Sequence, residues 1–255
     1  MASIPTACSK LLLCLTLLSA CAGIASAETH YKPRISLGGR AGVSMSRISL
    51  SPSVRQNWLT GSAGSLTFRY TEEKIFGLIA ELGWSRRGWS ENFSDPNSKV
   101  KNPLEYKRSL TYISLPVMTH VYFGTRRMKF FFNAGPEVSY MLTSGITSNF
   151  DYHNPSSSAH WPDRARMTEQ LTMDISNRFD YGITAGLGGE FYFNPRHSVN
   201  IEARFYYGLG NIFPAKVSDT FSASRCMNLE LTLGYWFRLK QQNKRVFHNY
   251  QPRCS

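Results

Sequence analysis

SVNIEARFYYGLG, residues 198–210, alternates apolar and polar side chains over almost its whole length. Because successive side chains of a β-strand point to opposite faces, this segment predicts a strand with one apolar face and one polar face. Such a strand separates two environments, and the alternation alone does not say which face meets water. The apolar face would hold Val199, Ile201, Ala203, Phe205, Tyr207 and Leu209, and the polar face Asn200, Glu202, Arg204 and Tyr206.

Seven further segments alternate in the same way, which brings the number of predicted strands to eight. The polar faces are dominated by Gly, Ser and Thr, with one or two charged residues in each strand. Small residues suit the crowded interior of a narrow barrel. The predicted strands span residues 34–48, 61–71, 75–87, 109–123, 128–143, 179–193, 197–209 and 227–239.

The connections between these strands alternate in length. Short polar links (EEK, GTRR and NPR) join the second strand to the third, the fourth to the fifth and the sixth to the seventh. Short turns at one end and long loops at the other are typical of outer-membrane barrels. The sequence therefore predicts an all-β fold, an eight-stranded antiparallel up-and-down transmembrane β-barrel with short periplasmic turns and long extracellular loops. The long segments cover residues 49–60, 88–108, 144–178 and 210–226.

Aromatic residues on the apolar faces form two groups, as expected for girdles at the two headgroup levels of a membrane. They favour a lipid-facing apolar surface. The alternative is a soluble secreted barrel with its apolar residues inside. The group near the short links contains Tyr70, Phe76, Phe123, Phe130, Phe193 and Phe237, and the group near the long loops contains Trp84, Tyr140, Tyr181 and Tyr207.

The N-terminal residues predict a targeting signal. Lys10, an apolar run from Leu11 and the small residues ending at Ala27 predict a secretory signal peptide over residues 1–27. Cleavage after Ala27 competes with a lipoprotein signal that would make Cys21 the first, acylated residue. We expect the barrel domain over residues 34–239 and a basic tail over 240–255, either a frayed end or a contact with anionic headgroups. The predicted localisation is the outer membrane.

Composition excludes several classes of function. The chain has 29 Lys and Arg against 17 Asp and Glu, a formal charge of +12, but no nucleic-acid type of basic run before the tail. Cys226 and Cys254, at opposite ends of the predicted barrel, are not expected to form a disulfide. No phosphate-binding, zinc-binding or dinucleotide motif is present. We expect no cofactor and no metal.

Charged residues on the predicted inner faces form the most informative set. An eight-stranded barrel is barely wide enough for its own side chains, so these charges must pair. We interpret them as an electrostatic plug that holds the register of the barrel, with a gated polar pore or proton path as the alternative. The set comprises Arg40, Arg69, Glu81, Glu137, Glu190, Glu202, Arg204 and Glu230, with His120 nearby.

The longest loop contains groups from which a Ser-His-Asp hydrolase could be drawn, among them His153, His160 and Asp163 beside Ser156–Ser158. Its Pro- and Ser-rich composition gives no sign of the order that catalysis needs. We expect no catalysis there and read the histidines as surface residues. The basic loop residues Lys99, Arg164 and Arg166 are expected to contact lipopolysaccharide.

Two prolines and three glycines have positional meaning. Pro116 and Pro136 fall within predicted strands, where proline cannot donate to the ladder, so we expect a bulge or a local break near each. Gly186, Gly188 and Gly189 are interpreted as lumenal room for bulky neighbours.

Several segments together resemble the PorT-type outer-membrane β-barrel proteins of Bacteroides and relatives. They are GGRAGVS (38–44), SLTFRYTEEKIFGLIAELGWSRRGW (65–89), YISLPVMTHVYFG (112–124), FFFNAGPEVSYML (130–142) and FDYGITAGLGGEF (179–191). The resemblance implies an outer-membrane barrel with a periplasmic N-terminus and, through the family's namesake, a link to protein secretion. It implies no site residues.

The predicted function is a structural or surface-interaction role through the extracellular loops. Lipid, lipopolysaccharide and host surface molecules are the expected partners. An accessory role in protein secretion is the main alternative, and a lipid-modifying enzyme or a narrow pore is less favoured. The segment from Thr232 to Leu239 resembles the C-terminal signal read by the outer-membrane assembly machinery, although it ends on Leu and a tail follows.

Overall fold

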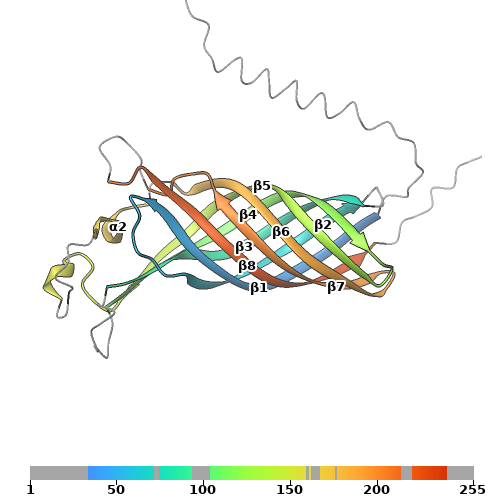
Figure 1. Cartoon of the computed structure of the whole chain (residues 1–255), viewed down its shortest axis with the longest axis horizontal. Coiled ribbons are helices and arrows are strands. Elements are labelled where there is room, and N and C mark those ends of the chain that lie inside the picture. Colours follow the sequence, from blue (N-terminus) through green and yellow to red (C-terminus); the bar gives the residue numbers. More distant parts are fainter. Residues whose placement is uncertain are drawn as a thin grey trace, which may run out of the picture. The chain divides into compact units, whose positions relative to one another are not determined.

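The computed structural model describes residues 34–71, 75–93, 104–158, 161, 167–175, 177–213 and 220–239. These residues form eight strands and two short helical turns, and the strands make a closed barrel (Figure 1). The strands are β1 (Arg34–Ser51), β2 (Leu59–Thr71), β3 (Phe76–Asn92), β4 (Glu105–Gly124), β5 (Met128–Ser148), β6 (Phe179–Asn194), β7 (His197–Gly208) and β8 (Ala223–Arg238); the turns are η1 (Pro155–Ser157) and α2 (Glu169–Thr172).

Every strand pairs antiparallel with its neighbours in the chain, and β1 pairs with β8 to close the ring. Opposite residues at the closure include Gly38 with Trp236 and Ser44 with Glu230. Closure satisfies the backbone groups that would be exposed at two free sheet edges. The predicted eight-stranded up-and-down barrel is therefore confirmed. Neither of the helical turns among the described residues has the length and apolarity that a membrane-crossing helix requires.

The barrel has its polar side chains inside and its apolar side chains outside. On β7, Ile201 is 52% exposed, whereas Glu202 and Arg204 are 3% and 2% exposed. The same alternation runs along the other strands, with Leu66, Leu187 and Leu233 among the most exposed residues. The alternative of a soluble barrel with an apolar interior is wrong, because this outer surface is stable only against lipid.

The aromatic side chains of both predicted girdles point outward. Most are well exposed, and Tyr70 and Tyr207 are partly exposed. Their positions match the two headgroup levels of a bilayer, where an amphipathic ring lies between lipid and water. The exposed members are Phe76, Phe123, Phe130, Phe193 and Phe237 near the short turns, and Trp84, Tyr140 and Tyr181 near the long loops.

The strands extend further toward the long loops than predicted, which corrects several boundaries. Residues 88–92, 105–108 and 144–148, expected in loops, continue β3, β4 and β5. The polar composition of these residues suggested loops, but their backbones pair across both ladders, as Trp89 does with Arg108 and Tyr106 with Ser148. The short turns agree with the prediction where they are described, at residues 125–127 and 195–196.

Both prolines interrupt a ladder without forming a bulge. Pairing between β4 and β5 stops after Pro116 and Glu137 and resumes at Thr119 and Ala134 in the same register. The β3–β4 ladder has a similar gap opposite Pro116. The expected local break is confirmed. The register shift between β4 and β5 lies elsewhere, between Thr111 and Tyr112.

Adjacent glycines on β6 differ sharply in their surroundings. A Cβ added to Gly188 would lie 2.2 Å from the carbonyl oxygen of Ile201 and 2.5 Å from the ring of Phe131, whereas one added to Gly189 would meet nothing closer than 4.0 Å. Gly186 is also crowded, by the Glu202 carboxylate at 2.6 Å. The predicted role as lumenal room is confirmed for Gly186 and Gly188 and is wrong for Gly189, which faces outward.

We expect Gly188→Ala to destabilise the barrel and Gly189→Ala to leave it almost unchanged. The added methyl group at position 188 must displace backbone, which typically costs about 1–3 kcal/mol. The measurement is urea unfolding of the protein refolded into lipid vesicles, with the heat-dependent shift in gel mobility as a check of folding. Equal stability of the two variants would show that lumenal crowding does not restrict this position.

Candidate functional site

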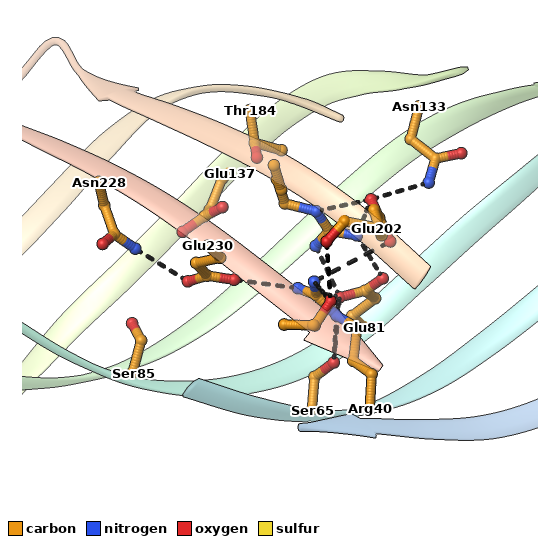
Figure 2. A network of polar contacts seen from close by, with 12 residues as sticks. Arg40, Ser65, Glu81, Ser85, Asn133, Glu137, Thr184, Glu202, Asn228 and Glu230 are labelled. Atoms are coloured by element: carbon orange, nitrogen blue, oxygen red, sulfur yellow. Dashed lines mark hydrogen bonds and ion pairs between the residues drawn. The ribbon is translucent and has the colours of Figure 1, made fainter. Parts of the chain in front are cut away.

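The centre of the lumen is filled by an ion-pair network (Figure 2). Arg204 on β7 binds both carboxylate oxygens of Glu81 on β3, at 2.8 and 2.9 Å, and also contacts Glu202 at 2.8 Å. Asn133 donates to Glu202 at 3.1 Å. All four side chains are buried. A bidentate hydrogen-bonded pair between a guanidinium and a carboxylate is the strong form of a salt bridge.

A second guanidinium completes this network. Arg40 on β1 lies 3.0 Å from Glu81, 3.4 Å from Glu230 and 4.0 Å from Glu202. Glu230 also accepts a hydrogen bond from Asn228 at 2.9 Å, drawn in Figure 2. The amide donors help to satisfy carboxylates that outnumber the two arginines. Five of the eight predicted lumenal charges are thus brought together at one level of the barrel.

Arg69 and Glu190 form a separate pair nearer the short turns. Their two hydrogen bonds measure 2.7 and 2.9 Å. Ser198 donates to the same carboxylate, and the guanidinium lies 4.1 Å from the centre of the Trp236 ring. His120 is buried in the same half of the barrel, with its Nδ1 2.7 Å from Asn133 Oδ1.

Glu137, the last member of the predicted set, pairs with a residue outside that set. Arg87 on β3 binds it at 2.6 Å and is 1% exposed. The same guanidinium lies 4.4 Å from the ring of Tyr206, whose hydroxyl donates to Asp180 at 2.9 Å. The alternation that places Glu81 on the inner face also places Arg87 there, so this signal was available in the sequence.

These ion pairs connect strands that are far apart around the ring. Arg204–Glu81 joins β7 to β3 and Arg69–Glu190 joins β2 to β6, and in each case three strands lie between the partners in either direction. Ladder hydrogen bonds connect only neighbouring strands. The ion pairs therefore hold opposite walls together and occupy the cross-section of the barrel.

Loop segments close the outer mouth with an apolar core. Leu171 of α2 and both Phe213 and Phe221 of the β7–β8 connection are fully buried. Phe213 packs edge-on against Trp89 of β3, with ring centres 5.9 Å apart. We call this unit the loop cap; its members are Trp89, Phe93, Leu104, Tyr106, Leu171, Ile212, Phe213 and Phe221, with Val54, Phe150, Tyr152, Trp161, Met167, Met173 and Ile175 packed around them.

Buried polar contacts fix the loop cap to the strands. Glu91 accepts hydrogen bonds from Trp89 Nε1 at 2.9 Å and from Gln170 Nε2 at 3.0 Å. Tyr106 donates its hydroxyl to the carbonyl of Leu171 at 2.9 Å, and Arg108 donates to the carbonyl of Met173 at 2.6 Å. The long 144–178 connection is therefore folded at these points. The apolar residues within the long predicted loops were the sequence signal for this core.

Of the loop residues considered for a hydrolase, the structure describes His153 and Ser156–Ser158, and the three expected glycolipid contacts lie outside the described residues. His153 is exposed and stacks on Tyr152, with ring centres 4.3 Å apart, while Ser157 donates to the carbonyl of Asn154. No group of three metal-ligating side chains occurs among the described residues. Cys226 is buried and free. The residues named in these predictions that lie outside the described ranges are residues 1–27 with Cys21, Lys99, His160, Asp163, Arg164, Arg166 and the 240–255 tail with Cys254.

A family model described as an outer membrane protein beta-barrel domain matches residues 26–214. The chain belongs to this family. The family match and the lipid-facing exterior identify an integral protein of the outer membrane, as predicted. The matched region ends before β8, which the structure nevertheless shows closing the ring. None of the curated proteins matches this outer-membrane barrel.

Solved outer-membrane proteins resemble this barrel weakly. The outer membrane protein OprG from Pseudomonas aeruginosa is 13% identical over 82% of this chain and 96% of its own, with a TM-score of 0.47. Ail, the attachment invasion locus protein of Yersinia pestis in complex with the heparin analogue sucrose octasulfate, is 14% identical over 80% and 99%, with a TM-score of 0.39. Neisserial surface protein A is 13% identical over 80% and 97%, with a TM-score of 0.40.

We expect Glu190→Gln to destabilise this barrel by roughly 3–5 kcal/mol, because it leaves the Arg69 charge buried without its partner. The double variant Arg69→Met, Glu190→Gln removes both charges and should recover most of that loss. Urea unfolding in vesicles measures both. The control is Lys107→Met, which breaks an exposed pair with Glu105 and should cost less than about 1 kcal/mol. A double variant no more stable than Glu190→Gln would contradict the pairing argument.

Proposed function

We propose that this protein is a sealed outer-membrane barrel that holds a folded loop cap at the cell surface for interaction with other molecules, without catalysis. The observation that carries the proposal is the burial of loop residues Leu171, Phe213 and Phe221 in the outer mouth, together with the polar contacts from Gln170 and Arg108. A connection that served only to join strands would not need a core of its own.

The ion pairs support a sealed lumen over a pore. The central network joins β1, β3, β7 and β8 at one level, and Arg69–Glu190 and Arg87–Glu137 lie on either side of it along the barrel. In a lumen this narrow, side chains that bridge opposite walls leave little room for a continuous water path. An ion crossing the barrel would have to break several of these pairs.

The wild-type protein is expected to show no stepwise conductance in planar lipid bilayers, because charged side chains fill its centre. Replacing Arg40, Glu81 and Arg204 together by serine should produce measurable conductance, provided that the heat-dependent gel shift shows that the variant has folded. A folded wild-type protein that conducts as readily as this variant would overturn the sealed-lumen proposal.

Lipopolysaccharide is the partner that we propose for the loops. The support is chemical: Lys99, Arg164 and Arg166 lie in the long extracellular connections of a protein embedded beside anionic glycolipid. The folded cap would present these connections at the level of the glycolipid headgroups. If the protein also binds host surface molecules, we propose that the same extracellular connections make that contact.

Substituting Lys99, Arg164 and Arg166 by glutamine should weaken lipopolysaccharide binding by at least tenfold, on the basis of about 1 kcal/mol per basic residue at an anionic surface. The measurement is titration of the protein in nanodiscs with purified lipopolysaccharide. The matched control is Lys107→Gln, which removes an exposed charge from the outer part of β4. Unchanged binding by the triple variant would exclude these residues as the contact.

A role in protein secretion is the second proposal, and it rests on the PorT-type resemblance of the segments between residues 38 and 191. The filled lumen argues against passage of a substrate through this barrel. An accessory role would therefore use the loop cap or the periplasmic rim. For assembly, we propose that Thr232–Leu239 at the end of β8 is read by the outer-membrane insertion machinery.

A further inference from the structure

The barrel end that carries the short turns has a strongly basic concavity of about 480 Å³. Its walls come from the start of β1, the β4–β5 turn, the β6–β7 turn and the end of β8. Five cationic side chains line it, and none of the described residues that line it is acidic. The cations are Arg34, Arg126, Arg127, Lys129 and Arg238.

Two cations of this rim, Lys129 and Arg238, are held differently from Arg69 inside the barrel. Arg69, deeper in the lumen, is neutralised by Glu190. Lys129 instead lies over aromatic rings, with its Nζ 4.2 Å from the ring centre of Tyr122 and 5.2 Å from that of Tyr192. The Arg238 guanidinium lies 5.5 Å from the Tyr192 ring. A ring orients a cation without cancelling its charge, so these groups keep their positive field.

One side of the concavity is continuous with the lipid-facing surface. Phe193, which lines it, is 60% exposed and belongs to the aromatic girdle at the short-turn end. Pro195 beside it is exposed as well. The concavity therefore opens at the headgroup level of the periplasmic leaflet, where an anion attached to an acyl chain can place its charge among the arginines and its chain along Phe193.

We propose that this rim concavity binds the phosphate of an anionic phospholipid from the periplasmic leaflet. Arginine matches the oxygen geometry of a phosphate through paired N–H donors, and Arg126 and Arg127 provide two such groups from one exposed turn. Lys129 and Arg238 form the inner wall of the concavity. Both cations lie over the Tyr192 ring and add positive charge beside the phosphate. The lipid would fix the depth of the barrel in the membrane at the end opposite the loop cap.

The test is native mass spectrometry of the full chain in a nonionic detergent, with phosphatidylglycerol and phosphatidylcholine of identical acyl chains as probes. We expect the wild-type protein to bind phosphatidylglycerol at least tenfold more tightly than phosphatidylcholine. Arg126→Gln with Arg127→Gln should remove most of that preference, at about fivefold per charge. Both positions are exposed turn residues, so folding should be kept, and Lys129→Gln provides an independent variant.

The matched control is Arg47→Gln with Arg55→Gln, the same change of charge on exposed residues at the other end of the barrel. It should bind phosphatidylglycerol like the wild type. The proposal is wrong if the two double variants lose affinity equally, or if the wild-type protein does not distinguish the two lipids. Inorganic phosphate and glycerol 3-phosphate form a separate arm: if either displaces the lipid at equal concentration, the concavity is a site for soluble phosphate and not for a lipid.

Discussion

The bidentate ion pair between Arg204 and Glu81 is the interaction on which the rest of this barrel depends. It joins β7 to β3 across the lumen, where backbone hydrogen bonds cannot reach. Lipid outside requires a closed ring of strands, and a closed ring of eight encloses a space that only its own side chains can fill. Charged groups in that space are stable only as pairs, so the position of each one restricts the positions of the others.

The two mouths of the barrel are lined by different kinds of side chain. At the outer mouth, rings and aliphatic side chains of the loop cap exclude water, and a few buried hydrogen bonds such as Gln170–Glu91 set the direction of the connection. At the periplasmic mouth, cations that lie over tyrosine rings line a basic concavity. The protein thus has folded loops with an apolar core at its outer end and a basic concavity at its periplasmic end.

The sequence predicted the strands and their faces because the period of two is a local property, visible within segments such as residues 198–210. It placed eight charges in the lumen but left out Arg87, and it did not predict which of them pair. Arg69 and Glu190 lie 121 residues apart, and their contact depends on the stagger of the whole ring. The loop cap was not predicted, because residues such as Leu171 and Phe213 are apolar but lie in segments without periodicity, so the sequence does not indicate what they pack against. Their burial depends on tertiary packing alone.

The unequal strand lengths give the outer rim an uneven height. β4 and β5 contain 20 and 21 residues, about 65–70 Å of extended chain, whereas β7 contains 12 residues, about 40 Å. The barrel therefore extends further outward on the β4–β5 side of the outer mouth than on the β7 side. For a large molecule that diffuses in the plane of the membrane, the loop cap is screened from one direction and open from the other, so an approaching neighbour meets this protein in a preferred orientation.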